Sequence, residues 1–129
     1  MTIELPQTPE NFVQRYEQAL ATQDWTVVDP LVEDDACVTF STGAVHIGKP
    51  AIRHAFEQNF SAIEDEVYRI SNIHWVDRNN ETAIYLFDFA WKGRIDGELA
   101  NGGGRGTCVL RRRDNGWRLL IEHLGPGTS

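Results

Sequence analysis

The sequence predicts an α+β fold in which three helices precede a long antiparallel sheet. Apolar residues recur at helical spacing up to about residue 63, and from residue 67 they alternate with the period of two that is typical of β-strands. In the stretch from Glu81 to Trp91 both alternating rows are mostly apolar, which predicts a central strand covered on both faces. Because helices and strands are segregated along the chain, the pattern favours α+β over α/β.

Each predicted helix has a start signal and an apolar face. Segment 8–21 begins with a threonine cap and a proline, and its apolar residues recur at helical spacing. Asp24 can cap a short second helix, which Pro30 is expected to kink or end because proline lacks a backbone N–H. A third helix is expected to open at Pro50, with its apolar face formed by Ile52, Ala55, Phe56, Phe60 and Ile63.

The predicted strands are rich in β-branched and aromatic residues and end at turn signals. They span residues 36–40, 67–77, 81–95, 105–113 and 117–124. The segments between them are predicted as an acidic turn at 33–35, a loop or short hairpin at 41–48, a turn at 78–80, a glycine-rich link at 97–104 and a tight turn at Asn115-Gly116.

Composition narrows the class of protein. A chain of 129 residues is expected to form a single domain. Its net charge of −7 argues against a nucleic-acid partner, because such binding depends on neutralising phosphates. The sequence has no run of about 18 apolar residues and no basic or apolar leader, so we expect no membrane span, no signal peptide and a cytoplasmic location. Cys37 and Cys108 are expected to be buried and reduced.

No motif indicates a metal or a cofactor, and none is expected. His46, His54 and His74 lack the spacing of paired metal ligands. The stretch from Gly102 to Gly106 lacks the strand-turn-helix context of a phosphate loop, and we interpret it as a hairpin or bulge at the rim of a pocket.

The second face of the central strand needs a cover that no fourth helix provides. Helices 8–21 and 50–63 offer one apolar face each, which is enough for one side of a curved sheet. We therefore expect a homodimer formed through the open sheet face, since two-fold pairing is the commonest kind of assembly.

Several strings of residues occur in an order that is similar to a known family. They are Phe12-Val13-Gln14-Arg15-Tyr16, Asp24-Trp25, Val32 to Val38, Gly48 to Arg53, Asn115-Gly116-Trp117-Arg118 and Glu122-His123. Over about residues 8–124 the chain resembles the nuclear transport factor 2-like superfamily, in particular its SnoaL-like and ketosteroid isomerase-like members. The resemblance implies a cystatin-like, cone-shaped half barrel with a strongly bent sheet, an apolar pocket at its wide end and dimers formed through the sheet.

Matching individual positions disfavours steroid isomerase chemistry. In ketosteroid isomerase-like enzymes a tyrosine of the first helix helps to hold an oxyanion, and Tyr16 stands at that position. Their general-base aspartate corresponds to Phe40 or its neighbour in this chain. Their protonated acid belongs between Gly104 and Val109, where this chain has no acid. Two of the three functional groups are therefore absent.

Four residues are candidates for proton transfer, namely Tyr16, Asp88, Glu122 and His123. Asp88 lies in an otherwise apolar strand, where burial would raise its pKa unless it is paired. The alternative is an ion pair with an arginine, for which the candidates are Arg105, Arg112 and Arg118. For Tyr16 the alternative is a packed aromatic residue with one hydrogen bond, and for His123 a satisfied core histidine.

The last strand has two alternating rows of side chains. The more apolar row, assigned to the concave face of the sheet, is Trp117, Leu119, Ile121 and His123. Glu122 then faces the partner subunit. A shift of one residue in register would invert this assignment.

These observations predict a small-molecule-binding domain with an apolar pocket. If it is an enzyme, we expect a cofactor-free isomerase, dehydratase or cyclase acting on a ring-containing or polyketide-like compound, with Tyr16 as hydrogen-bond donor and Asp88 or His123 as acid or base. The residues expected to line the pocket are Phe40, Phe56, Phe60, Tyr85, Phe87 and Trp91. The alternative is a non-catalytic binding or dimer-assembly module whose interior is filled by its own side chains.

Overall fold

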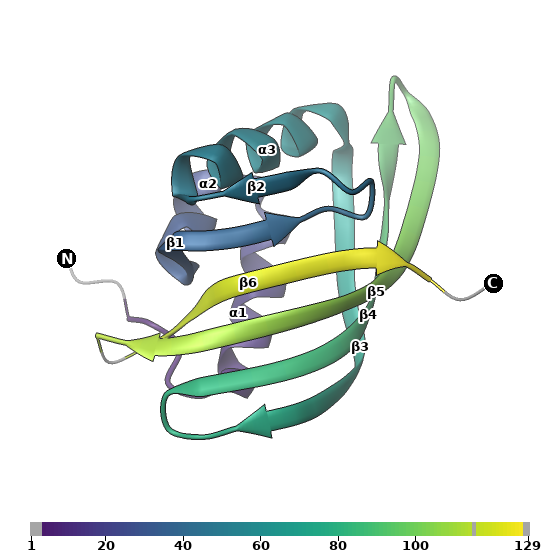
Figure 1. Ribbon diagram of the computed structural model, residues 1–129. Helices are drawn as coiled ribbons and strands as arrows, with labels where there is room; N and C mark the ends of the chain where they lie inside the picture. Colours follow the sequence, from purple (N-terminus) through teal and green to yellow (C-terminus); the bar gives the residue numbers. More distant parts are fainter. Residues whose placement is uncertain (1–3, 115, 128–129) are drawn as a thin grey trace.

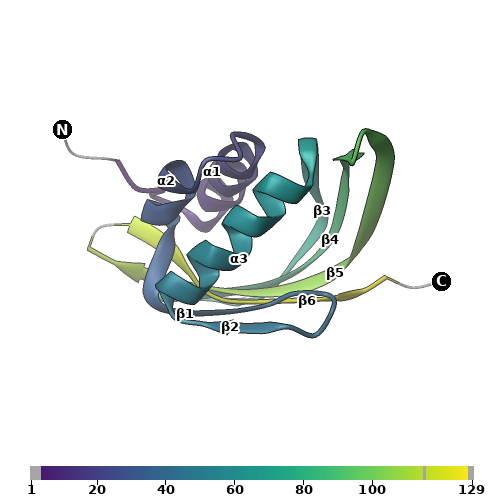
Figure 2. The ribbon, with the colours of Figure 1, turned by 90° about the horizontal axis from the view of Figure 1, so that it is seen from above.

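The structure, a computed structural model, describes residues 4–114 and 116–127. Three helices cover one face of a six-stranded sheet, which curves strongly around them and stays open (Figures 1 and 2). The predicted α+β fold with a strongly curved sheet is therefore confirmed. One pair of strands is parallel, so the sheet is mixed instead of purely antiparallel.

The helices are α1 (Pro9–Ala21), α2 (Trp25–Val28) and α3 (Lys49–Ala62), and a 3-10 turn (Asp29–Leu31) follows α2. The strands are β1 (Val32–Thr39), β2 (Val45–Ile47), β3 (Glu64–Arg78), β4 (Thr82–Ile95), β5 (Glu98–Arg113) and β6 (Gly116–Pro126). Their order across the sheet is β2-β1-β6-β5-β4-β3, and the parallel pair is β1 with β6. Strand β4 therefore has a hydrogen-bonded neighbour along each edge, as expected for a central strand, but the helices cover only one of its faces, and Leu86 on the other is 43% exposed.

The first two helices begin where their capping residues predict. The Thr8 hydroxyl accepts a hydrogen bond from the Asn11 N–H (3.0 Å), and the Asp24 carboxylate accepts one from the Thr26 N–H (2.9 Å). These bonds satisfy N–H groups that have no partner within the helix. Pro30 lies in the 3-10 turn that follows α2, so the predicted early stop is confirmed.

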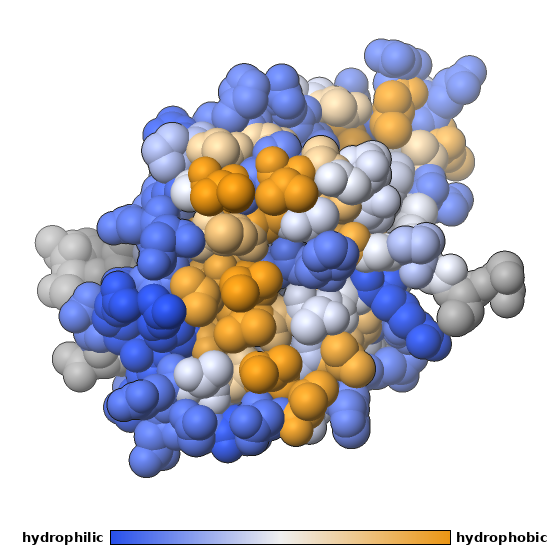
Figure 3. All heavy atoms as spheres, in the orientation of Figure 1, coloured by the Kyte–Doolittle hydropathy of each residue, from blue (hydrophilic) through white to orange (hydrophobic). Residues whose placement is uncertain are grey.

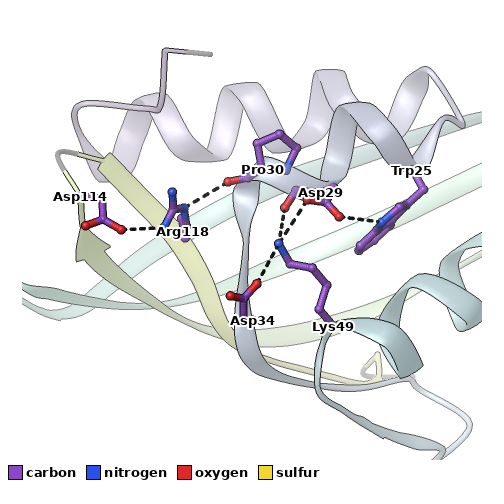
Figure 4. Close-up of polar contacts among 7 residues, drawn as sticks. All are labelled: Trp25, Asp29, Pro30, Asp34, Lys49, Asp114 and Arg118. Atoms are coloured by element: carbon purple, nitrogen blue, oxygen red, sulfur yellow. Dashed lines mark hydrogen bonds and ion pairs between the residues drawn. The ribbon is translucent and has the colours of Figure 1, made fainter. Parts of the chain in front are cut away.

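Lys49 ties the start of α3 to the turn after α2. Its Nζ donates to the main-chain carbonyl of Asp29 (3.1 Å) and to the Asp29 carboxylate (3.2 Å), and it forms an ion pair with Asp34 (Figure 4). The indole N–H of Trp25 donates to the other oxygen of the same carboxylate (3.1 Å). This network fixes α3 relative to β1, and the cavity described below is lined by residues of α3 and by Phe40, Ser41 and Thr42, which follow β1.

The acidic segment 33–35, predicted as a turn, belongs to β1. The pairing of β1 with β6 is irregular between Val32 and Cys37, so the strand continues through this segment with a bulge. Glu33 is only 4% exposed and forms an ion pair with Arg113 of β5 (3.7 Å). The ion pair compensates for the burial of the Glu33 carboxylate, and the bulge allows the strand to continue through the acidic segment.

Residues 98–104 of the glycine-rich stretch predicted as a link belong to the first half of β5, and Gly102 to Gly106 pair with β4 without a bulge. Three glycines of β5 lie opposite aromatic residues of β4, in the pairs Gly102 with Trp91, Gly104 with Phe89 and Gly106 with Phe87. A Cβ at Gly104 would lie 3.1 Å from the Phe89 ring, and one at Gly106 would clash with the Phe87 ring. The rings of β4 thus cover the backbone of β5, which requires glycine there.

Strand β6 contains a β-bulge at Leu120. In the register with β5 the flanking pairs are Val109 with Ile121 and Leu110 with Leu119, which leaves Leu120 unpaired. Before the bulge, Trp117 and Leu119 of the predicted apolar row are buried, as expected. After it the rows exchange faces, so Glu122 is buried on the helix side and His123 is exposed on the other. The predictions that Ile121 and His123 face the concave side and that Glu122 faces a partner subunit are therefore wrong, because one extra residue inverts the alternation.

The convex face of the sheet, turned away from the helices, carries a row of apolar residues that crosses five strands. The cross-strand pairs place Ile84, Val109, Ile121, Cys37 and Ile47 in this row. We call it the convex apolar row, and Figure 3 shows apolar side chains gathered on this face. Ile121 is 43% exposed and Ile47 72% exposed.

Three further expectations concern local features. Cys108 is buried, whereas Cys37 lies half-buried in the convex apolar row, so the expected burial holds for only one cysteine; both are free thiols. Asn115 lies outside the described residues, although Arg113 and Gly116 pair on either side of it. No helix in residues 4–114 or 116–127 is long and apolar enough to cross a membrane.

Candidate functional site

A cavity of about 220 Å³ lies between α1, α3 and the concave face of the sheet. Its walls are mostly apolar, and the apolar residues among them are Leu20, Phe40, Phe56, Phe60, Ile63, Phe89, Trp91 and Leu124. Its polar lining consists of two carboxyl groups, two tyrosines and the neutral side chains of Ser41, Thr42 and Asn59. The interior is therefore not completely filled by its own aromatic residues.

One of the two carboxyl groups, Glu122, is 3% exposed and hydrogen-bonded to Tyr16. The Tyr16 hydroxyl donates to Glu122 Oε1 at 3.3 Å. Tyr16 comes from α1 and Glu122 from β6, so the pair forms only when the helix packs on the sheet. The bulge at Leu120 is what turns Glu122 towards the helix.

Burial controls the protonation of both members of this pair. It raises the pKa of Glu122 to about 7, because the charged carboxylate loses its hydration, and the hydrogen bond from Tyr16 opposes this rise. Burial, followed by the charge of Glu122, raises the pKa of Tyr16 well above its usual value. Near neutral pH, Glu122 is therefore present in both protonation states, while Tyr16 remains a neutral hydrogen-bond donor.

The second carboxyl group, Glu66, lies with Tyr68 at the start of β3 and lines the same cavity. Burial raises the pKa of Glu66, and burial also raises the pKa of Tyr68 well above its usual value. The Tyr68 ring stacks on Phe89, with 5.9 Å between centroids. The cavity thus holds two carboxyl groups and two neutral phenols among apolar walls.

The structure separates Asp88 from this cavity. Asp88 lies on the convex face, where its carboxylate accepts a hydrogen bond from Asn72 Nδ2 (2.7 Å) and forms an ion pair with Arg105 Nε (3.4 Å). The alternative interpretation, an ion pair with a neighbouring arginine, is therefore confirmed. Asp88 and His123 both line a groove on the convex face, which we call the convex groove, so neither residue adjoins Tyr16.

Four of the six residues expected to line the pocket do line it, namely Phe40, Phe56, Phe60 and Trp91. Tyr85 and Phe87 do not line this cavity but belong to the core, where they are 1% and 3% exposed. Their side chains point to the concave face, as their row predicts, but the ring of Trp75 covers Tyr85 with 4.9 Å between centroids.

Sequence reasoning considered Glu122 but placed it on the wrong face, and it missed Glu66 and Tyr68. The available signal for Glu122 was the run Leu119-Leu120-Ile121, in which three apolar residues in succession interrupt the alternation. Glu66 and Tyr68 lie where β3 begins, and no periodicity before that point indicated a cavity.

Within residues 4–114 and 116–127, no group of three or more His, Cys, Asp and Glu side chains is arranged to hold a metal ion. Glu122 and Glu66 are the carboxyl groups of the cavity, and they are accompanied by phenol hydroxyls. This arrangement can move a proton and can donate hydrogen bonds to a developing negative charge.

Comparison with solved structures identifies close structural neighbours at low sequence identity. A proposed aromatic ring hydroxylase from Novosphingobium aromaticivorans superposes with a TM-score of 0.84 at 19% identity, covering 93% of this chain and 87% of the other. A proposed dehydratase of the NTF2-like family from Streptomyces avermitilis gives 0.82 at 16% identity, covering 92% of each chain. An uncharacterised protein with a cystatin-like fold from Caulobacter vibrioides gives 0.76 at 18% identity, covering 90% and 84%.

The curated proteins contain none with significant sequence similarity to this chain. The SnoaL-like domain family, in contrast, matches residues 10–127, which is nearly the whole chain. The family match and the shared architecture of the structural neighbours agree with each other. The chain therefore belongs to the SnoaL-like domain family, and it shares the fold of solved structures described as NTF2-like and cystatin-like.

Proposed function

We propose that the cavity binds a small ring-containing molecule and that Glu122 and Tyr16 catalyse proton transfer on it without a cofactor. The observation that carries this proposal is Glu122, a carboxyl group buried in an apolar cavity with a pKa of about 7. A group whose pKa lies near the working pH can both accept and return a proton. Glu122 thus takes the role that the sequence suggested for Asp88 or His123.

The reaction class follows from the groups that face the cavity. As a carboxylate, Glu122 takes a proton from a carbon beside a substrate carbonyl group; the C–H electron pair forms the C=C bond of an enolate, and the π pair of the carbonyl moves to its oxygen. Tyr68 donates a hydrogen bond to this oxyanion, and Tyr16 does so when proton transfer to Glu122 has freed its single O–H. Return of the proton to another carbon gives an isomer, and its return to a β-hydroxyl group releases water.

The cavity limits the size of the substrate. A cavity of roughly 150 Å³ lined by apolar side chains holds a benzene molecule. The cavity of about 220 Å³ has room for one ring with a substituent, which supports a single-ring substrate. The resemblance in fold to a proposed dehydratase is consistent with this reaction class.

Exchange of substrate hydrogen for deuterium tests the proposal, because it reports proton abstraction even without net turnover. Small cyclic ketones and β-hydroxyketones are incubated with the protein in deuterated buffer and followed by NMR. We expect exchange that Glu122→Gln abolishes and Asp88→Asn retains. Equal exchange by wild type and Glu122→Gln contradicts the proposed role, and no exchange with any compound favours the alternative of a non-catalytic binding or assembly module.

We also propose that the convex face pairs with a second copy of the chain. The support is the convex apolar row, which leaves Ile121 and Ile47 substantially exposed in the single chain. An exposed apolar face of this kind is common at homodimer interfaces. Light scattering at micromolar concentration tests this proposal, and a monomeric mass contradicts it.

A further inference from the structure

The charged groups that line the cavity are all of one sign. Glu122 and Glu66 line it, and among its described lining residues there is no lysine, arginine or histidine. The other polar groups there are neutral hydroxyls and the amide of Asn59. A ligand that carries a negative charge would meet no compensating cation and at least one partly ionised carboxylate.

The apolar walls are suited to a positive charge for an independent reason. Six aromatic side chains other than Tyr16 line the cavity, namely Phe40, Phe56, Phe60, Tyr68, Phe89 and Trp91. Their rings meet at varied angles, such as 73° between Phe56 and Phe60 and 32° between Phe40 and Phe56. Rings arranged in this way present several faces and edges to one space, and aromatic faces attract organic cations.

We infer that the cavity selects organic cations, and that its preferred ligand is a protonated amine attached to a single ring. The ammonium group donates hydrogen bonds to Glu122 or Glu66, and the ring packs against the aromatic walls. This inference names the substrate class of the proposed site, and it rests on the part of the proposed function that assigns ligand binding to the cavity. Proton transfer is not required for it.

The protonation of Glu122 makes this selectivity depend on pH. With a pKa of about 7, Glu122 is about one tenth ionised at pH 6 and about nine tenths ionised at pH 8, so the affinity for a cation should rise about tenfold between them. The charge of Glu122 acts on titratable groups of four surrounding elements, namely Tyr16 of α1, Tyr68 of β3, Tyr85 of β4 and Cys108 of β5, and Glu66 of β3 lines the same cavity. Burial raises the pKa of Glu66, and it raises the pKa of the three phenols and the thiol well above their usual values, so these four stay neutral while Glu122 titrates between pH 6 and 8.

Three ligands of similar size and different charge test the inference on the wild-type protein. Benzylamine is a cation near neutral pH, benzyl alcohol is neutral and benzoate is an anion. Titration calorimetry, with NMR of the Trp91 indole N–H to locate the ligand, measures each affinity. We expect benzylamine to bind roughly tenfold or more tightly than benzyl alcohol, and benzoate to bind more weakly than either.

Variants that each replace one glutamate by glutamine test whether the preference for benzylamine arises in the cavity. Glu122→Gln and Glu66→Gln each remove one carboxylate from the lining with little change of shape, and we expect each to reduce the preference for benzylamine. The control is Glu57→Gln, because the Glu57 side chain is 49% exposed on α3 and pairs with Arg53. This control should leave the preference unchanged.

The outcomes are separable from those of the deuterium experiment. Benzoate binding as tightly as benzylamine, no binding of benzylamine at millimolar concentration, or a preference that survives in the double variant Glu122→Gln/Glu66→Gln overturns the inference. Cation selectivity without any deuterium exchange supports the inference and contradicts only proton transfer. Deuterium exchange without cation selectivity supports proton transfer and contradicts only the inference.

Discussion

Phe87 and Gly106 face each other across β4 and β5, and the Phe87 ring occupies the space that a side chain at position 106 would need. The same relationship recurs between Trp91 and Gly102, whereas a Cβ at Gly104 would clash with the Gly125 carbonyl oxygen of β6 and lie 3.1 Å from the Phe89 ring. The rings that line the core and the cavity therefore depend on glycines of the next strand, so a substitution on β5 should act through β4.

Gly106→Ala is expected to destabilise the protein by about 1–3 kcal/mol, because the added methyl group forces the Phe87 ring or the β5 backbone to move. Urea unfolding measures this difference. Thr107→Ala is the control, since Thr107 is exposed and points to the other face. In the double variant Phe87→Leu/Gly106→Ala, the smaller side chain at position 87 should relieve part of the clash. If the double variant loses as much unfolding free energy as the two single variants added together, this account is contradicted.

Glu122→Gln should change how stability depends on pH. The folded-state pKa of Glu122, about 7, lies above its ordinary value of 4.5, so the charged form is the one that folding disfavours. The wild type is therefore relatively most stable below pH 4.5 and loses about 3 kcal/mol as the pH rises from 4.5 through 7. Glutamine cannot ionise, so the variant should gain on the wild type by about this amount between pH 4.5 and 8. Urea unfolding at pH 4.5 and pH 8 measures both proteins. If the difference in unfolding free energy between the variant and the wild type is the same at both pH values, the assignment is contradicted.

Tyr16→Phe should raise the pKa of Glu122 above its value of about 7. The hydrogen bond from Tyr16 is the interaction that lowers this pKa, and its removal leaves the effect of burial unopposed. Carboxyl-carbon NMR over a pH titration measures the change. Tyr68→Phe is the comparison, because among the described residues Tyr68 donates no hydrogen bond to Glu122. An unchanged or lowered pKa in Tyr16→Phe would be inconsistent with the pair.

Asp88→Ala and His123→Ala together should leave binding in the cavity unchanged. Both residues lie on the convex face, and the ion pair between Asp88 and Arg105 joins side chains that are 38% and 64% exposed. Loss of such a pair costs less than about 1 kcal/mol. The affinity of the double variant for benzylamine should equal that of the wild type. A large loss of affinity would show that the convex groove communicates with the cavity.

Ile121→Glu should dissociate the proposed dimer, because it places a charge at the middle of the convex apolar row. The matched control is Leu99→Glu, since Leu99 is 80% exposed at the start of β5, outside that row. Light scattering at equal concentrations should give a monomer for Ile121→Glu and a dimer for the control. Two dimeric variants would exclude this face as the interface.

The sequence by itself determined the elements whose information is local. Thr8 and Asp24 mark helix starts through bonds to residues two or three positions away, and Pro30 ends a helix through its own missing N–H. The alternating rows of β4 are equally local, and they correctly separate the buried Phe87 from the outward-facing Asp88. Family resemblance then supplied the curved sheet that the periodicity alone does not specify.

Only the tertiary structure decided what faces the cavity. The glycines of β5 form a strand because rings from β4 cover them, and Glu122 lies beside Tyr16 because one unpaired residue, Leu120, inverts the rows of β6. Both effects arise between strands, where the backbone of one strand adjusts to its neighbour. The run Leu119-Leu120-Ile121 shows that the alternation is interrupted, but it does not show which residue is left unpaired, since a bulge leaves the sequence continuous while it exchanges the two faces.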